Sequence, residues 1–251
     1  MARNSHRAFR LAGRSVFEKD GSPKPAVVRG IEKAVEVQRP LVLANIRRLQ
    51  RKHPEASAAE LVGILEKHYL AAVTGTGAAV GATAVVPAVG TVAALGLSAA
   101  ATVGFLEATA LFAQSVAEIH GIRLADPERA RTMVMAIMLG EEGTSLMQQL
   151  ASGRGGSPWA GTIGGMPSGV MGNIGATIRR RFMRKVVARQ GTAMLGRALP
   201  LGVGAVVGGA GNLAMGRAVI ASTRRAFGPA PETLDGELAA DLRALPDGPA
   251  A

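Results

Sequence analysis

The chain has 251 residues, which is enough for one large domain or two small ones with a buried core. Only 3% of its residues are aromatic, whereas 33 are Gly, so its apolar residues favour helices in close contact over an aromatic-rich core. The absence of Cys excludes disulfide scaffolds, thiolate zinc sites, iron–sulfur clusters and a cysteine nucleophile.

The net charge of +11 is distributed unevenly along the chain. Residues 143–231 contain 11 Lys or Arg and no acid, whereas residues 232–251 contain one Arg and five acids. An acid-free tract of this length predicts contact with an anionic surface, either lipid headgroups or nucleic acid. The basic start of the chain lacks the apolar segment of a secretory signal, which predicts a cytoplasmic location.

The first half of the chain reads as a basic arm followed by helices. Residues 1–25 are expected to form a flexible basic arm, and residues 26–150 a helical region. Ser57 and Glu60 have the spacing of a capping box, which predicts that a helix begins there.

A long uncharged segment follows that helix start. Residues 69–106 contain no Lys, Arg, Asp or Glu, and Pro87 and Gly90 divide them into two helical arms. The first arm would be about 25 Å long, shorter than a hydrocarbon core of about 30 Å, and the turn between the arms is apolar. A helical hairpin is therefore predicted, either re-entrant in a membrane or packed inside a soluble bundle.

Small residues recur at every fourth position in two parts of the chain, the hairpin and a second uncharged segment at residues 198–216. Such ridges allow two helix backbones to approach closely, although a chain rich in Gly and Ala also produces this spacing by chance. The expected helix-packing positions of this glycine zipper are Gly77, Gly81, Gly90, Gly204, Gly208, Asn212 and Gly216.

The second half of the chain is divided by its composition. Asp126, Pro127 and Glu128 predict a helix start, and residues 151–175, with nine Gly, predict a flexible connector. Residues 176–228 are expected to form a basic amphipathic helix and a glycine-rich helix. Residues 229–251 are expected to be an acidic, disordered tail with a short helix near residues 238–245.

A polar strip lies on one face of the second hairpin arm. Glu107 is followed by Gln114 and Glu118 at spacings of seven and eleven, so the three side chains share a helix face. This pattern is consistent with a polar strip inside a membrane or cavity. We favour the alternatives, a solvent-facing stripe or a buried pair with an Arg of residues 179–189.

Basic residues gather on the helix expected after the connector. Four of them share one arc of that helix, and Ile178, Phe182 and Val186 share another. This is the pattern of an amphipathic helix at a membrane interface, and equally of a solvated basic face over a packed apolar one. The candidate lipid- or anion-binding residues are Arg179, Arg180, Arg181, Arg184, Lys185 and Arg189.

The sequence contains no pattern typical of catalysis. It lacks a phosphate-binding loop, and residues 96–100 lack the last Gly of a nucleophile elbow. Glu118 and His120 are two residues apart on a predicted helix and so point to different faces, which is poor geometry for a metal. We therefore expect no catalytic residues, no cofactor and no metal.

Several segments together carry a resemblance to a known family. They are Ala-Glu-Ile-His-Gly at residues 117–121, Asp-Pro-Glu-Arg at 126–129, the glycine-rich segments 73–90 and 201–212, and Arg-Arg-Ala-Phe-Gly at 224–228. With these, residues 55–228 resemble the EcsC-like protein family. The resemblance implies a helical, membrane-associated bacterial protein without established catalytic residues, and the family's founding member is encoded beside an ABC transporter.

These observations predict an all-α bundle built around the glycine-rich hairpin. The expected function is non-enzymatic association with anionic lipid, or with an envelope or transport complex, at the cytoplasmic face of the cell membrane. Self-association or another protein partner is compatible with this reading. The alternative is a soluble helical bundle that binds an acidic partner such as nucleic acid, against which the scarcity of aromatic residues for base stacking argues. A hydrolase is a third alternative.

Overall fold

The computed structural model describes residues 24–83, 91–151, 159–196 and 203–245, and every regular element in these ranges is an α-helix. The prediction of an all-α bundle is confirmed. In chain order the helices are α2 (Pro25–Ala34), α3 (Arg39–Lys52), α4 (Ala58–Thr83), α5 (Thr91–Ile119), α6 (Pro127–Leu139), α7 (Glu141–Ala151), α8 (Ala160–Gly164), α9 (Ser168–Gly196), α10 (Val203–Phe227) and α11 (Gly236–Ala244).

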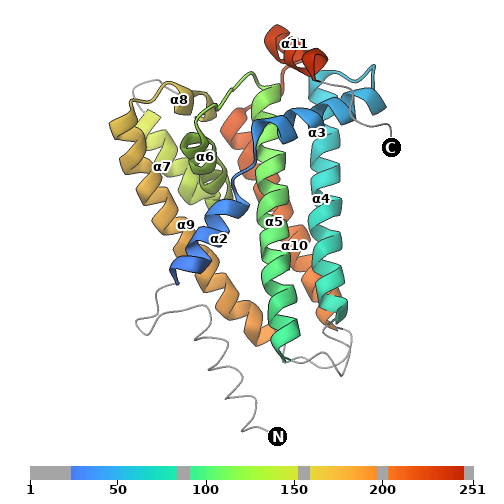
Figure 1. Ribbon diagram of the computed structural model, residues 1–251, viewed down its shortest axis with the longest axis vertical. Helices are drawn as coiled ribbons and strands as arrows, with labels where there is room; N and C mark the ends of the chain where they lie inside the picture. Colours follow the sequence, from blue (N-terminus) through green and yellow to red (C-terminus); the bar gives the residue numbers. More distant parts are fainter. Residues whose placement is uncertain (1–23, 84–90, 152–158, 197–202, 246–251) are drawn as a thin grey trace, which may run out of the picture.

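Three long helices, α4, α5 and α10, run side by side (Figure 1). The helices α6 to α9 lie to one side of them, α2 crosses the middle of the molecule, and α3 and α11 lie at one end (Figure 1). The two glycine-rich regions, which belong to α4, α5 and α10, therefore pack against each other.

The start of α4 follows from local hydrogen bonds. The Ser57 backbone N–H donates to the Glu60 carboxylate over 2.8 Å, and the Glu60 N–H donates to the Ser57 hydroxyl over 3.2 Å. The predicted capping box is therefore confirmed. Because this carboxylate accepts hydrogen bonds from the Ser57 backbone and hydroxyl, the pKa of Glu60 is lowered.

Aromatic and hydroxyl side chains join α4 to α5 near the middle of both helices. The Tyr69 ring stacks on Phe112 with a centroid distance of 4.7 Å, and its hydroxyl lies 2.8 Å from the Thr109 hydroxyl. Burial raises the pKa of Tyr69. These contacts fix which residues of α4 and α5 lie at the same level.

The second group of helices packs around α6. Asp126 caps this helix by accepting a 2.9 Å hydrogen bond from the Glu128 N–H, as the sequence predicted. Met133, Val134 and Ile137 of α6 are completely buried. Arg129 donates to the carbonyls of Gly164 and Met166, which joins α6 to the segment around α8.

The predicted connector is largely folded. Residues 152–158 lie outside the described residues, but residues 159–175 contain α8 and the first turns of α9. Trp159, Ile163 and Met171 are buried in the core. The prediction of a flexible connector is therefore wrong for residues 159–175. A Gly costs a helix about 1 kcal/mol, and burial of these large side chains offsets that cost.

The acidic tail is also folded as far as residue 245. Its short helix was predicted and is confirmed as α11, whose Leu238 and Leu242 are almost completely buried. The backbone carbonyl of Glu232 accepts a 3.1 Å hydrogen bond from the Ala58 N–H at the start of α4. The predicted short helix thus belongs to a longer packed segment, and the prediction of disorder is wrong for the residues just before it, among which Leu234 packs against the core. Leu238 and Leu242, four residues apart on one helix face, provide the physical reason.

Candidate membrane-binding surface

The three long helices share an end without charged residues. Residues 69–83 of α4, 91–106 of α5 and 203–216 of α10 contain no Lys, Arg, Asp or Glu. At 1.5 Å per residue, each segment is about 21–24 Å long. We call these three segments the charge-free end; they form the lower part of the long helices in Figure 1.

The three segments reach their first charged residue at a common level. Lys67 of α4, Glu107 of α5 and Arg217 of α10 are all exposed. They are aligned because Gly216 lies against Leu70 and Tyr69 lies against Thr109. These three exposed charges, which we call the border, mark the level at which the charge-free end begins.

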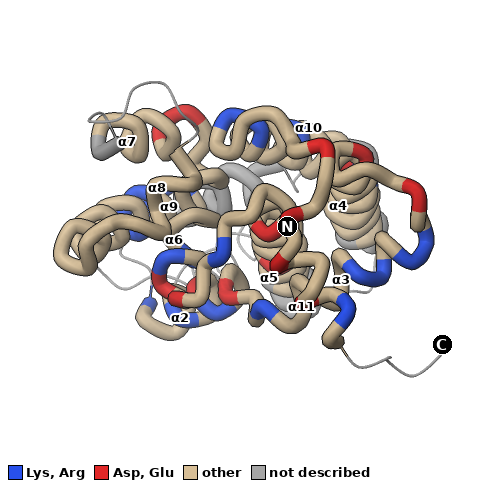
Figure 2. Tube along the Cα trace, turned by 90° about the horizontal axis from the view of Figure 1, so that it is seen from above, with Lys and Arg blue, Asp and Glu red and all other residues tan. Residues whose placement is uncertain are grey.

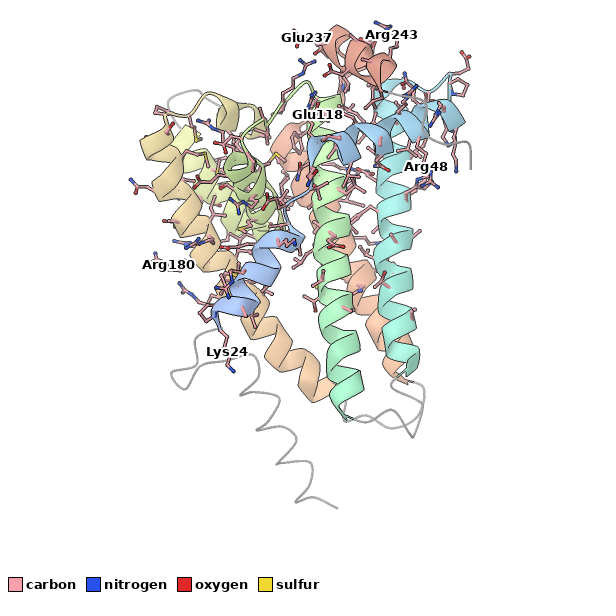
Figure 3. The ribbon with its side chains drawn as sticks, in the orientation of Figure 1. Lys24, Arg48, Glu118, Arg180, Glu237 and Arg243 are labelled. Carbon is pink, nitrogen blue, oxygen red and sulfur yellow. The ribbon has the colours of Figure 1, made fainter. Side chains whose placement is uncertain are left out.

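The opposite end of the molecule carries charges of both signs. Figure 2, seen from above, shows Lys and Arg positions along α3 and acidic and basic positions around α11. Figure 3 shows Arg48, Glu237 and Arg243 at this end. The long helices are therefore near charged groups at this end and uncharged at the other, although Figure 3 shows Lys24 and Arg180 of the neighbouring helices beside their uncharged half.

The described surface of the charge-free end is made of small side chains. Its exposed positions include Ala71, Ala79 and Ala214, and Val103 is 37% exposed. The Thr76 hydroxyl donates a 2.8 Å hydrogen bond to the Ala72 carbonyl one turn earlier. That hydroxyl is satisfied within its own helix and does not require water.

One segment has the length and composition of a membrane span. Among the described side chains it is Ala100–Ile119, and 56% of its residues are buried inside the protein. Core helices of soluble proteins satisfy the same criterion. The half of α5 that belongs to the charge-free end is shorter than a bilayer.

The structure brings part of the predicted glycine ridge together. Asn212 donates a 2.9 Å hydrogen bond to the Val73 carbonyl, and Gly216 lies against Leu70 and Val73, so both face α4. Gly209 also faces α4, since a Cβ there would be 3.7 Å from the Ala78 Cβ. The spacing of seven between Gly209 and Gly216 could have identified this position, which the pattern of four missed.

The structure describes the surroundings of few of the other predicted ridge positions. Gly77 is buried in α4. Gly81, Gly204 and Gly208 lie within helices, but their surroundings are outside the described residues, as is Gly90. The glycine zipper as a whole therefore stays a prediction.

Half of the predicted basic cluster is engaged within the protein. Arg179 pairs with Glu32 at 3.2 Å, and Arg181 pairs with Glu142 at 2.8 Å. The Lys185 ammonium donates a 2.6 Å hydrogen bond to the Leu139 carbonyl at the end of α6. These three side chains stabilise the packing of α9 on its neighbours.

Two arginines of the cluster remain available to bind an anion. Arg180 and Arg184 are exposed, and neither forms an ion pair or hydrogen bond within the described part of the chain. Figure 3 shows Arg180 directed outward from α9. The side chain of Arg189 is outside the described residues.

The apolar face of α9 is buried. Ile178 is 1% exposed and Phe182 is 2% exposed, while Val186 is half-buried against the same core. These side chains pack inside the protein and cannot enter a headgroup region. The prediction of an interfacial amphipathic helix is therefore wrong for α9, and the alternative of a solvated basic face over a packed one describes it.

The polar strip is divided between solvent and core. Glu107 is exposed, whereas Gln114 and Glu118 are buried, and Arg39 and Asn45 of α3 contact α5 at Glu118 and Ser115. The Gln114 side-chain nitrogen has no hydrogen-bond partner in the described structure. Of the two alternatives that the sequence favoured, the solvent-facing one describes Glu107. The other, a buried pair with an arginine of residues 179–189, is not formed by Glu118, which pairs with Arg39.

The Arg39 side chain of α3 pairs with two carboxylates, one on α5 and one on α11. Its Nε and Nη2 atoms donate to the two carboxylate oxygens of Glu118 over 2.7 and 3.0 Å, and Nη2 also donates to Asp241 of α11 over 2.8 Å. The Glu118 hydrogen bond is the main cause of the raised pKa of Arg39, and Arg39 in turn lowers the pKa of Asp241. No sequence spacing joins these residues, so sequence reasoning missed them.

The other polar groups of the described chain do not form a catalytic arrangement. In the described ranges, no group of three or more His, Asp or Glu could hold a metal ion. The Nδ1 atom of His120 lies 2.8 Å from the Val116 carbonyl oxygen, and the centroid of its ring lies 5.2 Å from that of Phe227. Glu66 accepts two hydrogen bonds from Arg224. Neither arrangement joins a nucleophile to a base.

Comparisons of this chain with protein-family models, with curated proteins and with solved structures found no match. The resemblance to the EcsC-like family therefore stays a prediction that rests on the segments named above.

Proposed function

We propose that this protein is a non-enzymatic, membrane-associated protein that inserts its charge-free end part of the way into a bilayer containing anionic lipid. The observation that carries the proposal is the alignment of three uncharged helix ends behind one border of exposed charges. Away from its terminal turns, each helix satisfies its own backbone hydrogen bonds, which is what a lipid environment requires.

The length of the charge-free end favours partial insertion. Segments of about 21–24 Å are shorter than a hydrocarbon core of about 30 Å, so the helices enter the bilayer without crossing it. Insertion leaves Lys67 and Arg217 at the headgroup level. Each basic residue near an anionic surface contributes about 1 kcal/mol to binding.

The proposed location is the cytoplasmic face of the cell membrane, whose anionic lipids suit the net charge of +11. The implied membrane association of the EcsC-like family agrees with this location. Support of an envelope or transport complex, through self-association or another protein, is compatible with a charged end that faces the cytoplasm.

The absence of Cys makes a direct test possible. A single Cys replaces Val103 at the charge-free end and carries an environment-sensitive nitrobenzoxadiazole dye. Vesicles of phosphatidylglycerol and phosphatidylcholine are then added. Insertion predicts a blue shift, an increase in emission and quenching by spin-labelled lipid.

The matched control places the same dye at Ala240, an exposed position of α11 at the charged end. Its emission should not change. Equal responses at Val103 and Ala240, or no response at Val103, would overturn the proposal. Binding to duplex DNA with a steep salt dependence, together with no response to vesicles, would instead support the soluble, acid-binding alternative.

A further inference from the structure

A groove lies between α2 and α9, on the side of the molecule where Lys24 and Arg180 are seen in Figure 3. It is a cavity of about 420 Å³. Its lining combines the apolar side chains of Val28 and Met183 with the guanidinium groups of Arg179 and Arg180. Ala176 and Thr177 complete the lining.

The charge of this groove is only partly compensated, because Arg179 pairs with Glu32 and Arg180 has no acidic partner in the described chain. Its lining residues include no acid, and Arg180 has no partner within the described chain. Arg179 has one contact, at 3.2 Å to Glu32, which leaves other N–H donors of its guanidinium free. The neighbouring cleft differs, because Glu32 and Glu128 balance Arg131 and Arg179 there.

Exposed guanidinium groups beside an apolar floor favour a particular class of ligand. A guanidinium binds a phosphate through two parallel hydrogen bonds, which a carboxylate-free groove permits. The apolar floor suits the glycerol and the first methylene groups that a lipid phosphate carries. We infer that the α2–α9 groove binds the headgroup of an anionic phospholipid.

The inference rests on the proposed function and adds a specific headgroup site to it. Figure 3 shows Arg180 and Lys24 nearer to the charge-free end than Arg48, Glu118 or Arg243. A molecule inserted by its charge-free end would therefore direct this groove, rather than the charged end, toward the lipid headgroups. Inorganic phosphate and nucleic acid present the same anion without the adjoining alkyl chain.

The first experiment uses a lipid that does not require a membrane. Dihexanoyl-phosphatidylglycerol, kept below its critical micelle concentration, is titrated into the full chain by calorimetry. Saturable binding is expected, with much weaker binding of dihexanoyl-phosphatidylcholine and of inorganic phosphate. Equal binding of phosphatidylcholine would overturn recognition of the anionic headgroup. Equal binding of inorganic phosphate would show a free-anion site in place of a lipid site.

Two pairs of variants then locate the binding. Arg180→Gln should weaken binding about fivefold, the equivalent of about 1 kcal/mol per cation. Arg48→Gln, an equal change of charge on exposed α3, should leave binding unchanged. Ala176→Glu places an acid in the groove and should abolish binding, whereas Asn173→Glu adds the same charge to an exposed position outside the lining and should preserve most of it.

Arg180→Lys distinguishes paired hydrogen bonds to a phosphate from non-specific electrostatic attraction. It keeps the charge but removes the paired N–H donors, so binding should stay weaker than in the wild type. Equal losses for Arg180→Gln and Arg48→Gln would show that net charge alone matters and would overturn the groove. Folding of every variant is checked by its thermal transition.

The outcomes separate the two proposals. If dye at Val103 reports insertion while Arg180→Gln and Ala176→Glu bind short-chain phosphatidylglycerol as the wild type does, the groove is wrong and the proposed function stands. If the short-chain lipid binds in the groove but Val103 does not respond to vesicles, the insertion is wrong. Loss of binding with both Glu variants, together with tight binding of duplex DNA, would overturn the lipid site in favour of nucleic acid.

Discussion

The Asn212 side chain of α10 donates a hydrogen bond to the backbone carbonyl of Val73 in α4, across 2.9 Å. This contact lies within the charge-free end, where few polar groups are present to replace it. Gly216, one turn further, allows α10 to approach Leu70 and Val73. The hydrogen bond and the close approach together fix how α4 and α10 are aligned, and so fix the level of Lys67 and Arg217.

The first prediction concerns this close approach. Even a Cβ at Gly216 would be 2.9 Å from Leu70 Cδ2 and 3.1 Å from Val73 Cγ2, so Gly216→Leu must displace these side chains or separate the two helices. We expect it to reduce the free energy of unfolding by about 1–3 kcal/mol. Gly211→Leu is the control, because nothing lies within 4 Å of a Cβ there. Equal denaturation midpoints for both variants would show that α10 does not pack through Gly216.

The second prediction concerns the buried carboxylate of Glu118. Its side chain is 6% exposed, and Arg39 donates to both of its oxygens. Arg39→Gln would leave this carboxylate buried without its cation, which should cost about 3 kcal/mol of stability. Arg48→Gln on the exposed face of the same helix should cost almost nothing. Urea unfolding of both variants provides the comparison, and similar midpoints would contradict the prediction.

The third prediction is a dependence on pH. The hydrogen bond from Arg39 lowers the pKa of Asp241 below its ordinary value of 3.8. A carboxyl group whose pKa is lower in the folded state stabilises the protein above the unfolded pKa, and this contribution is lost as the pH falls through the folded pKa. Asp241→Asn should therefore melt at a lower temperature than the wild type at pH 7. The difference should disappear as the pH falls below 3.8, and a constant difference across this range would contradict it.

Local sequence signals predicted the elements that depend on neighbouring residues. The capping box at Ser57, the Asp126 start of α6 and the short helix α11 are of this kind, because their hydrogen bonds or apolar faces lie within a few residues. The connector was predicted wrongly because its nine Gly suggested flexibility. The buried side chains of Trp159 and Met171, which outweigh the glycines, depend on α6 and the rest of the core.

The candidate surface was predicted less well, because it also depends on contacts between residues far apart in the sequence. The sequence identified the basic residues of α9, but periodicity could not show that Ile178 and Phe182 face the core rather than a lipid surface. It also could not show which cations are paired. Glu32 and Glu142, the partners of Arg179 and Arg181, are 147 and 39 residues away, so only tertiary structure separates Arg180 from its neighbours.

The fourth prediction concerns the acidic segment after α10. Removal of residues 229–251 would delete α11, with its buried Leu238 and Leu242, and would also delete the Asp241 partner of Arg39. We expect a clearly lower melting temperature for the chain that ends at residue 228. A chain shortened only by residues 246–251 keeps each of these contacts and should melt close to the wild type. Equal melting of both truncated chains would show that α11 does not stabilise the bundle.

The last prediction tests the border of the charge-free end. Lys67 and Arg217 are exposed on different helices, at the level where the uncharged segments begin. If they lie among anionic headgroups, Lys67→Glu combined with Arg217→Glu should weaken binding to phosphatidylglycerol vesicles strongly. Binding to phosphatidylcholine vesicles should change much less. The difference between wild type and variant should shrink with added salt, since the Debye length falls from about 10 Å at 0.1 M to about 3 Å at 1 M.

The matched control for this border reverses the same number of charges elsewhere. Arg48→Glu combined with Arg225→Glu changes two exposed cations outside the border, so the net charge of the two double variants is identical. Sedimentation with vesicles at several salt concentrations should then separate them, because only Lys67 and Arg217 would lie near the headgroups. Equal loss of binding in both double variants would mean that the net charge of the whole molecule, rather than the border, determines attachment. The proposal that the charge-free end faces the membrane would then be wrong.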